Sequence, residues 1–291
     1  MTHEPASGIR SRLFIGLQYL LPHHLLTRMI RSLAHARVGW LSSALIRGFL
    51  RLYPVDLTEA EHREASAYAS FNAFFTRRLR SGMRPVPHEP AVAVCPVDGY
   101  LSQSGRLAGD MLLQAKGIAY PVGGLLAGDA ALTASFTDGS FATLYLAPHN
   151  YHRVHMPLAG TLRIARFVPG DLFSVNAVTA AAVPGLFARN ERIACVFDTV
   201  AGPMAVVLIG ALFVGSMSLS WEAEVLPVRP RTVRNLPAPD PPIALARGAE
   251  LGWFNMGSTV ILLFGPAGPR LVPGLEPGRA IRMGEPIATL P

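Results

Sequence analysis

Glycine and proline are distributed very unevenly along this chain of 291 residues. Residues 1–84 contain 8 of them, whereas the 207 residues that follow contain 44. Both residue types are rare inside helices and frequent in turns, so they predict helices first and then short strands separated by turns. We therefore expect an α+β protein, with a helical N-terminal region (1–84) and a β-rich, barrel- or sandwich-like domain (85–291).

Short apolar runs support the predicted strands in the second region. They are VAVCPVDG, SFATLYLAP, TLRIARFVPG, RIACVFDT, MAVVLIGALFVG and STVILLFG. In the first region, Thr58 and Glu61 have the spacing of a capping box, which predicts that a helix containing Tyr68, Phe71 and Phe74 begins there.

Positive charge is concentrated at the N-terminus. The formal net charge is +7, and residues 1–55 hold seven Arg and one acidic residue, which leaves the remainder nearly neutral. Leu25, Met29 and Leu33 recur every four residues beside arginines, and residues 37–51 repeat this mixture. Basic amphipathic helices of this kind bind anionic membrane surfaces. The alternative is a helical subdomain packed on the rest of the protein; nucleic-acid binding is less favoured, because the charges alternate with Leu and Phe.

No segment predicts a membrane-spanning helix. The apolar stretch 13–27 is too short, 199–221 fits buried strands better, and 251–269 contains four Gly and two Pro. The N-terminus lacks the pattern of a secretory signal. Two cysteines a hundred residues apart indicate no disulfide framework or zinc site, so we expect a cytoplasm-facing protein at the membrane periphery.

The sequence motifs that could carry chemistry are individually weak. His149, His152 and His155 fall within seven residues, but without a neighbouring acidic residue or cysteine they do not predict a metal site. Asp98 precedes Gly99 in a pattern typical of a turn. Ser258 follows Gly257 at the start of an apolar run, which is also usual for a turn.

Together these motifs supply an Asp, a His and a Ser in the order Asp98, His155, Ser258, and such triads occur in several orders on unrelated folds. Ser258 could also attack the carbonyl of its own preceding peptide bond. Gly257 has no Cβ to obstruct that attack and tolerates strained backbone angles. A His to accept the hydroxyl proton and an Asp to orient it would activate the serine.

With these motifs, the chain resembles the phosphatidylserine decarboxylases of the longer, membrane-associated bacterial type. The resemblance extends in order over most of the length, and the HRVHMP and Gly-Ser-Thr motifs are highly specific when they occur together. Met256 stands where the family commonly has Leu, a swap that conserves size. The matching segments are LQYLLP (17–22), FNAFFTRRLR (71–80), PVDGYLSQ (96–103), LQAKG (113–117), YLAPHNYHRVHMP (145–157), FVPGDLFSVN (167–176), VPGLFARNER (183–192) and FNMGSTVILLF (254–264).

The resemblance implies a self-processing enzyme of phospholipid biosynthesis. Ser258, with His155 as base and Asp98 as its orienting partner, would cleave the chain into β (1–257) and α (258–291) chains. Ser258 would become a covalent pyruvoyl group that forms a Schiff base with phosphatidylserine, releasing CO2 and phosphatidylethanolamine. His152 is implied as the proton donor of the decarboxylation, and no metal is implied. The α and β chains would stay together, and whether such units assemble further is left open.

Other functions remain open on the residues alone. One is a pyruvoyl enzyme acting on a soluble amino acid, or a serine hydrolase that uses the same triad. Another is a non-catalytic β-rich module held at a membrane by its basic helices. Lys116 is the only lysine, so a pyridoxal-phosphate decarboxylase would have a single candidate for its Schiff base. A carbonyl group made from the chain itself removes that need.

Overall fold

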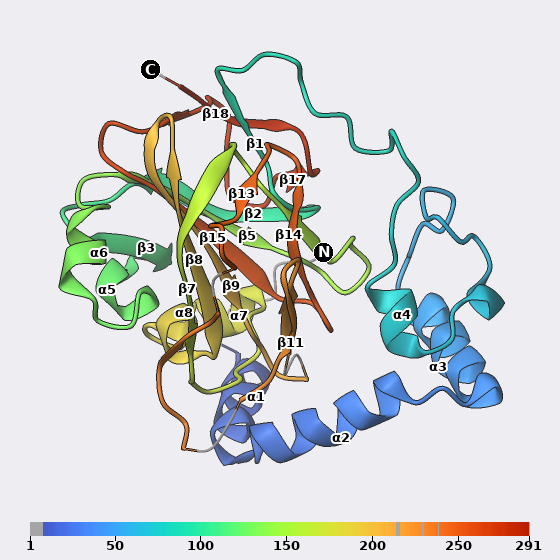
Figure 1. Cartoon of the computed structure of the whole chain (residues 1–291). Coiled ribbons are helices and arrows are strands. Elements are labelled where there is room, and N and C mark those ends of the chain that lie inside the picture. The colour runs from blue at the N-terminus through green and yellow to red at the C-terminus, as the bar shows by residue number, and fades with distance from the viewer. Residues whose placement is uncertain (1–7, 214–215, 228–229, 238, 291) are drawn as a thin grey trace.

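The computed structural model describes residues 8–213, 216–227, 230–237 and 239–290 and confirms an α+β protein (Figure 1). Helices dominate the N-terminal region and strands dominate the remainder. The helical elements are α1 (Ile9–Leu20), α2 (His23–His35), α3 (Gly39–Leu52), the 3₁₀ turn η1 (Ala65–Ala67), α4 (Phe71–Phe75), α5 (Val122–Leu125), α6 (Ala130–Ala134), α7 (Ala177–Ala180) and α8 (Leu186–Arg189).

The largest sheet is antiparallel. Among the described strands its two end strands do not pair with each other, so it is an open sheet and the expected barrel alternative is not formed. Its order is β12 (Arg234–Asn235), β7 (Gly160–Val168), β8 (Arg192–Thr199), β9 (Gly202–Ile209), β15 (Thr259–Phe264), β5 (Ser140–Tyr145), β2 (Gly99–Arg106) and β17 (Ala280–Ile281), and β13 (Ala244–Leu245) also pairs with β7.

Three smaller sheets complete the β-rich part. The one that concerns the site has four strands in the order β11 (Glu222–Val225), β10 (Met217–Leu219), β14 (Glu250–Phe254) and β6 (Arg153–His155). The others are β1 (Val92–Val94), β18 (Pro286–Thr289) and β16 (Arg270–Leu271) in one sheet, and β3 (Met111–Ala115) with β4 (Ile118–Pro121) in the other.

Burial explains the long uncharged stretches of the sequence. Every residue of β15 is buried, as are the last six of β9, because both strands lie in the middle of the large sheet and are covered on both faces. The apolar stretch 199–221 therefore forms buried strands, as expected. In the described part of the chain, no helix is long and apolar enough to cross a membrane.

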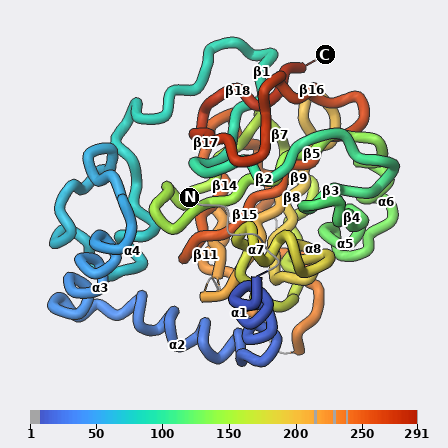
Figure 2. Tube along the Cα trace, turned by 180° about the vertical axis from the view of Figure 1, so that it is seen from behind, coloured from blue at the N-terminus to red at the C-terminus, as the bar shows by residue number. Residues whose placement is uncertain are grey.

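The N-terminal helices lie along one end and one side of the β-rich part. In Figures 1 and 2, α1 lies near α7 and α8, α2 runs along one edge, and α3 and α4 form a separate group. The capping-box prediction at Thr58 is wrong: no helix begins there, because the Thr58 N–H and hydroxyl both donate to Asp56. Helix α4 instead begins after Ser70, whose side chain accepts a hydrogen bond from the Ala73 N–H.

Candidate active site

Ser258 lies where the chain passes from the four-stranded sheet to the large one. Residues 255–258 connect the end of β14 to the start of β15. At the start of this connection, the Asn255 N–H donates to the Ser216 carbonyl at 3.2 Å. At its end, the Leu146 N–H donates to the Ser258 carbonyl at 2.8 Å. Hydrogen bonds to neighbouring segments thus hold the backbone on both sides of the Gly257–Ser258 peptide bond.

The hydroxyl of Ser258 is buried and has no hydrogen-bond partner among the described residues. Ser258 is 1% exposed, and its Oγ makes no hydrogen bond to any residue that the structure describes. A buried polar group without a partner costs about 1–3 kcal/mol. Because native proteins rarely carry that cost without a reason, the free hydroxyl indicates a chemical role at this position.

His152 lies directly against the peptide that precedes this serine. A Cβ placed on Gly257 would come within 2.0 Å of the His152 Nε2, so only glycine fits beside this ring. The ring is fully buried, with its centroid 4.1 Å from that of Phe75 on α4. Burial, and secondarily the nearby Arg77, lower the pKa of His152 well below its ordinary value. His152 is therefore a neutral imidazole next to the Gly257–Ser258 bond.

His155 is on β6, one strand away from the chain that leads to Ser258. Its Nδ1 is 2.9 Å from the Gly248 carbonyl, and its Nε2 is 3.0 Å from the Tyr151 hydroxyl. Since a carbonyl can only accept, Nδ1 carries the proton and Nε2 accepts from Tyr151. Burial is the main cause that lowers the pKa of His155, so Nε2 keeps its lone pair at neutral pH.

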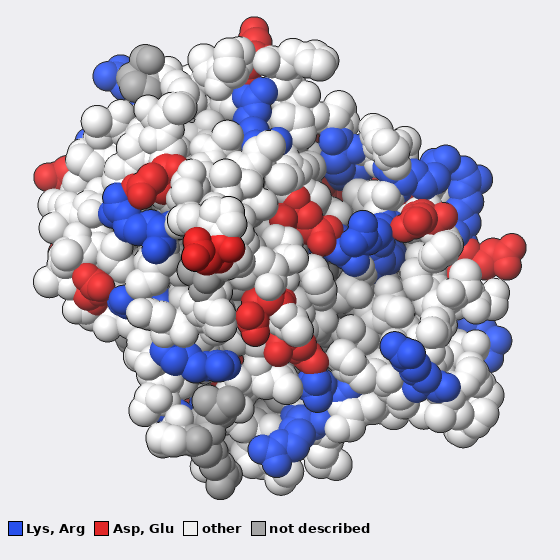
Figure 3. Space-filling model, viewed as in Figure 1, with Lys and Arg blue, Asp and Glu red and all other residues white. Residues whose placement is uncertain are grey.

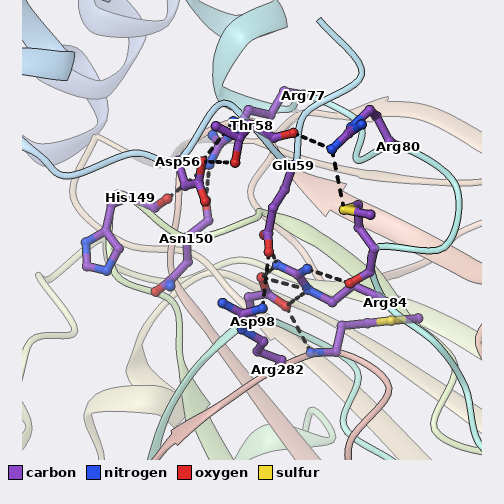
Figure 4. A network of polar contacts seen from close by, with 12 residues as sticks. Asp56, Thr58, Glu59, Arg77, Arg80, Arg84, Asp98, His149, Asn150 and Arg282 are labelled. Carbon is purple, nitrogen blue, oxygen red and sulfur yellow. Dashed lines mark hydrogen bonds and ion pairs between the residues drawn. The ribbon is translucent and has the colours of Figure 1, made fainter. Parts of the chain in front are cut away.

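Asp98 is held by an arginine that the sequence analysis did not single out. The Arg84 Nε lies 2.8 and 3.1 Å from the two carboxylate oxygens of Asp98, and the Met283 N–H donates to the same carboxylate at 2.9 Å. Arg84 also donates to Glu59 at 2.7 Å (Figure 4). Asp98 is close enough to favour the protonated form of His155. The structure shows no hydrogen bond between the two side chains.

The predicted site residues are thus brought together only in part. Buried Ser258 and His152 lie on the two sides of the partly buried Gly257, one bonded to it and the other packed against it, whereas His155 and Asp98 are hydrogen bonded to other partners on neighbouring segments. The segments themselves touch, because the His155 N–H donates to the Pro96 carbonyl at 2.8 Å. Among the described residues, no three His, Cys, Asp or Glu side chains are grouped as metal ligands.

A cavity of about 360 Å³ borders Asp98 and is lined by charged residues from both regions of the chain. Arg77 is one of them; it is 4% exposed and donates to the backbone carbonyls of His149 and Asn150 at 3.0 and 3.2 Å (Figure 4). Arg77 therefore anchors the loop that leads into His152. The FFTRRLR segment contained this residue, but no local pattern showed which arginine would be buried.

We expect Arg84→Met to destabilise the fold, because it leaves the nearly buried carboxylate of Asp98 without its cation. The side chains of Arg84 and Asp98 are each 9% exposed. Breaking such a pair costs about 3–5 kcal/mol in the free energy of unfolding, which urea denaturation measures. Arg163→Met removes the pairing of Arg163 with Asp198, whose side chains are 44% and 55% exposed, and should cost less than about 1 kcal/mol. Equal losses in the two variants would contradict this account.

The sequences of known protein families match both the helical and the β-rich region of the chain. A family model described as "Phosphatidylserine decarboxylase" matches residues 71–289, and a second, described as "PSD", matches residues 13–54. The first match includes Asp98, His152, His155 and the Gly257–Ser258 step.

Several curated relatives carry the name "Phosphatidylserine decarboxylase proenzyme". The chain is 52% identical to that of Pseudomonas aeruginosa strain LESB58 over 283 residues, which cover 97% of this chain and 98% of the relative. It is 51% identical to that of Ectopseudomonas mendocina over 279 residues, covering 95% and 98%. It is 50% identical to that of Methylococcus capsulatus over 273 residues, covering 94% and 95%. Together with the geometry around Ser258, these matches show that the chain belongs to the phosphatidylserine decarboxylase family.

Proposed function

We propose that this chain is a pyruvoyl-dependent carboxy-lyase that converts phosphatidylserine to phosphatidylethanolamine and CO2 in phospholipid biosynthesis. The observation that carries the proposal is the buried hydroxyl of Ser258, which has no partner in the described part of the chain, beside a glycine that packs against His152. A proenzyme needs such a group, because the nucleophile must lie next to the bond that it breaks. Family membership supplies the reaction.

Self-cleavage divides the chain between Gly257 and Ser258 into a β chain, 1–257, and an α chain, 258–291. The Ser258 Oγ bonds to the Gly257 carbonyl carbon, the peptide C–N bond breaks, and the hydroxyl proton is transferred through a base to the freed nitrogen. The resulting ester then loses the Cα proton of residue 258 and releases the Gly257 carboxylate. Water replaces the nitrogen as ammonia leaves, so the atoms balance without an oxidant.

We assign the base of this cleavage to His155 and its electrostatic partner to Asp98. The unprotonated Nε2 is the ring atom that can accept the hydroxyl proton, and reaching Ser258 requires its hydrogen bond to Tyr151 to open. Asp98 favours the charged imidazolium that would form. His155 lies on β6 opposite Glu250, at the start of β14, so this assignment requires the edge strand β6 to move toward the cleaved connection that follows the end of β14.

The residues around Ser258 fit a pyruvoyl group, which would supply the carbonyl that accepts the substrate amine and the electrons released with CO2. The Leu146 N–H already donates to the Ser258 carbonyl, where negative charge would be stabilised. His152 lies against Gly257. We propose that it is the acid of the decarboxylation. Because burial favours the neutral ring, it would first take up a proton, which the substrate ammonium group can supply, and then pass it to the substrate carbon.

The N-terminal helices expose apolar residues and bury polar ones. On α1, Ser11 and Gln18 are buried, whereas Ile9, Leu13 and Leu17 are 78%, 68% and 53% exposed. Gln18 accepts a hydrogen bond from the Ser174 N–H and donates to Thr179, which fixes its helix face against the β-rich part. A surface helix in water normally buries its apolar residues and exposes its polar ones. The exposed apolar face of α1 therefore suits an apolar surrounding such as a membrane interface.

The same pattern continues on α2, where Thr27 is buried and Leu25 and Met29 are 56% and 62% exposed. Figure 3 shows arginine side chains among uncharged ones along the edge that α2 and α3 occupy. We propose that residues 1–84 bind an anionic membrane surface peripherally, on the cytoplasmic side, and that residues 85–291 form the catalytic domain. The α and β chains of one precursor are the partners within the protein.

Leu13→Glu combined with Leu17→Glu should weaken membrane binding. Each apolar side chain buried at the interface contributes about 1.5–3 kcal/mol, so the pair should reduce binding to anionic vesicles by roughly a hundredfold or more in a flotation assay. Val200 is 92% exposed in the turn between β8 and β9, so Val200→Glu is the control and should bind normally. Unchanged flotation of the double variant would exclude α1 from the docking surface.

Two measurements on the purified wild-type protein test the proposed function. Intact mass analysis should find two fragments, and the shorter one should lack a free amino group at residue 258. Phosphatidylserine vesicles should then yield phosphatidylethanolamine and CO2. An uncut, active chain would favour a serine hydrolase, turnover of only a soluble amino acid would change the substrate class, and inactivity with binding would indicate a membrane module.

A further inference from the structure

Glu191 is a buried acid for which the proposed reaction has no role so far. It is fully buried, and neither oxygen of its carboxyl group hydrogen bonds to a residue that the structure describes. Its backbone, in contrast, is fixed on both sides: the Glu191 N–H donates to Asp171, and the Gly210 N–H donates to the Glu191 carbonyl. The unpaired state of the carboxyl is therefore not explained by a loose backbone.

The strand register places Glu191 in one row with Ser258. Arg192 pairs with Ile209, which pairs with Thr259. One residue further along each strand, Glu191, Gly210 and Ser258 follow one another across the sheet. The hydrogen bond from the Gly210 N–H to the Glu191 carbonyl continues the pairing of β8 with β9. The hydrogen bond from the Leu146 N–H to the Ser258 carbonyl continues the pairing of β15 with β5.

Glu191 and Ser258 project from the same face of the large sheet. Directly opposite residues of antiparallel strands share a face, and consecutive residues alternate. Arg192 faces the α5 and α8 side, because it donates to carbonyls of Leu125 and Ala188. Glu191 and Ser258 therefore face away from that side. Two strand spacings, about 10 Å, separate their Cα atoms, and Gly210 contributes no side chain between them.

The Glu191 carboxyl and the Ser258 hydroxyl are thus two buried groups, without partners among the described residues, in one row on the same face of the sheet. A neutral carboxyl has both a donor and an acceptor oxygen, so it can pair with a hydroxyl directly or through one buried water. We infer that Glu191 is a positioning residue that holds the Ser258 hydroxyl toward the Gly257 carbonyl for self-cleavage. This inference rests on the proposed function.

The surroundings of Glu191 favour the neutral form that this role needs. Burial raises the pKa of Glu191 to about 7, against the opposing influence of Arg231 and Arg234. Arg234, on β12, lies with its guanidinium 5.1 Å from the ring centre of Phe167, and Arg231 donates to the Gly170 carbonyl. The structure gives neither arginine a hydrogen bond to the Glu191 carboxyl.

The test compares self-cleavage of full-length chains after cell-free synthesis, followed by gel and intact mass. Glu191→Leu should cut at least about tenfold more slowly, because it removes a hydrogen bond to the nucleophile. Glu191→Gln, which can still donate and accept, should stay within about threefold of the wild type. Thr143→Val is the matched control: Thr143 is also buried and unpaired among the described residues but belongs to a row on the opposite face, so this variant should cut normally.

Folding is measured separately, in chains that also carry Ser258→Ala and therefore stay uncut. Glu191→Leu should melt at the same temperature or higher in this background, since an unpaired buried carboxyl is replaced by an apolar side chain. Slow cleavage with unchanged or raised stability supports the inference. Cleavage at the wild-type rate, or a Glu191→Leu chain that does not fold, overturns it. If the wild type itself stays uncut, the proposed function fails instead.

Discussion

Replacing Ser258 with Ala is expected to leave one uncut chain of 31.2 kDa without decarboxylase activity, where the wild type gives two fragments. Alanine keeps the backbone of the connection but removes the only atom that can attack the Gly257 carbonyl. The expected effect on cleavage is all or none, because a positioned nucleophile lowers the barrier by about 7–11 kcal/mol. Intact mass analysis measures it directly.

Ser140→Ala is a suitable control for this variant. Ser140 is also a buried serine in the large sheet, but it lies at the far end of β5, and its hydroxyl donates to the Pro269 carbonyl at 3.2 Å. The control should cut and decarboxylate like the wild type. Cleavage of the Ser258→Ala chain between residues 257 and 258 would contradict the assignment of the nucleophile.

The broad fold could be predicted because it depends on local composition. Segregated glycine and proline indicated helices followed by strands, and this order is confirmed. The predicted start of the helix before Phe71 was wrong. The Thr58 N–H and hydroxyl hydrogen bond to the nearby carboxylate of Asp56 instead of capping a helix. The sequence could not show whether the large sheet closes into a barrel. Closure depends on whether the first and last strands of the sheet pair with each other, and no local pattern specifies which strands these are.

Motifs within one segment also predicted part of the site. Gly257, Ser258 and His152 were named from two short segments, and the structure packs His152 against Gly257 through the pairing of β6 with β14. Arg84 was missed because its partners, Asp98 and Glu59, are 14 and 25 residues away in the sequence and no local pattern joins them. The role that we infer for Glu191 depends on Ser258, which lies on another strand. The contacts of His155 with Tyr151 and Gly248 were equally outside the reach of sequence spacing.

Aromatic residues connect the N-terminal helices to the site. Phe49 on α3 lies 6.0 Å from Phe75 between ring centres, and Phe75 lies 4.1 Å from His152. Met256, in the cleaved connection, packs against both this helical cluster and the main core. The buried site is therefore covered by the region that we expect to dock on the lipid.

His152→Ala should separate the two reactions: the chain is cut, but phosphatidylethanolamine formation from phosphatidylserine vesicles falls by roughly a hundredfold to ten-thousandfold. Cleavage should survive because the base is assigned to His155. Removing the ring only enlarges the space beside Gly257. In the wild type this space is so tight that a Cβ on Gly257 would lie 2.0 Å from the His152 Nε2. Decarboxylation should fail because the His152 imidazole is the proposed carrier of the proton to the substrate carbon. Gel analysis and lipid chromatography of one preparation measure both effects.

His149→Ala provides the matched control from the same segment. His149 lines the cavity beside Asp98, and Arg77 contacts its carbonyl rather than its ring, so the loop should keep its anchor when the side chain is removed. This control should both cut and decarboxylate. Normal phosphatidylethanolamine formation by His152→Ala would exclude His152 as the acid. An uncut His152→Ala chain would instead move the role of base from His155 to the ring that already lies against the cleaved bond.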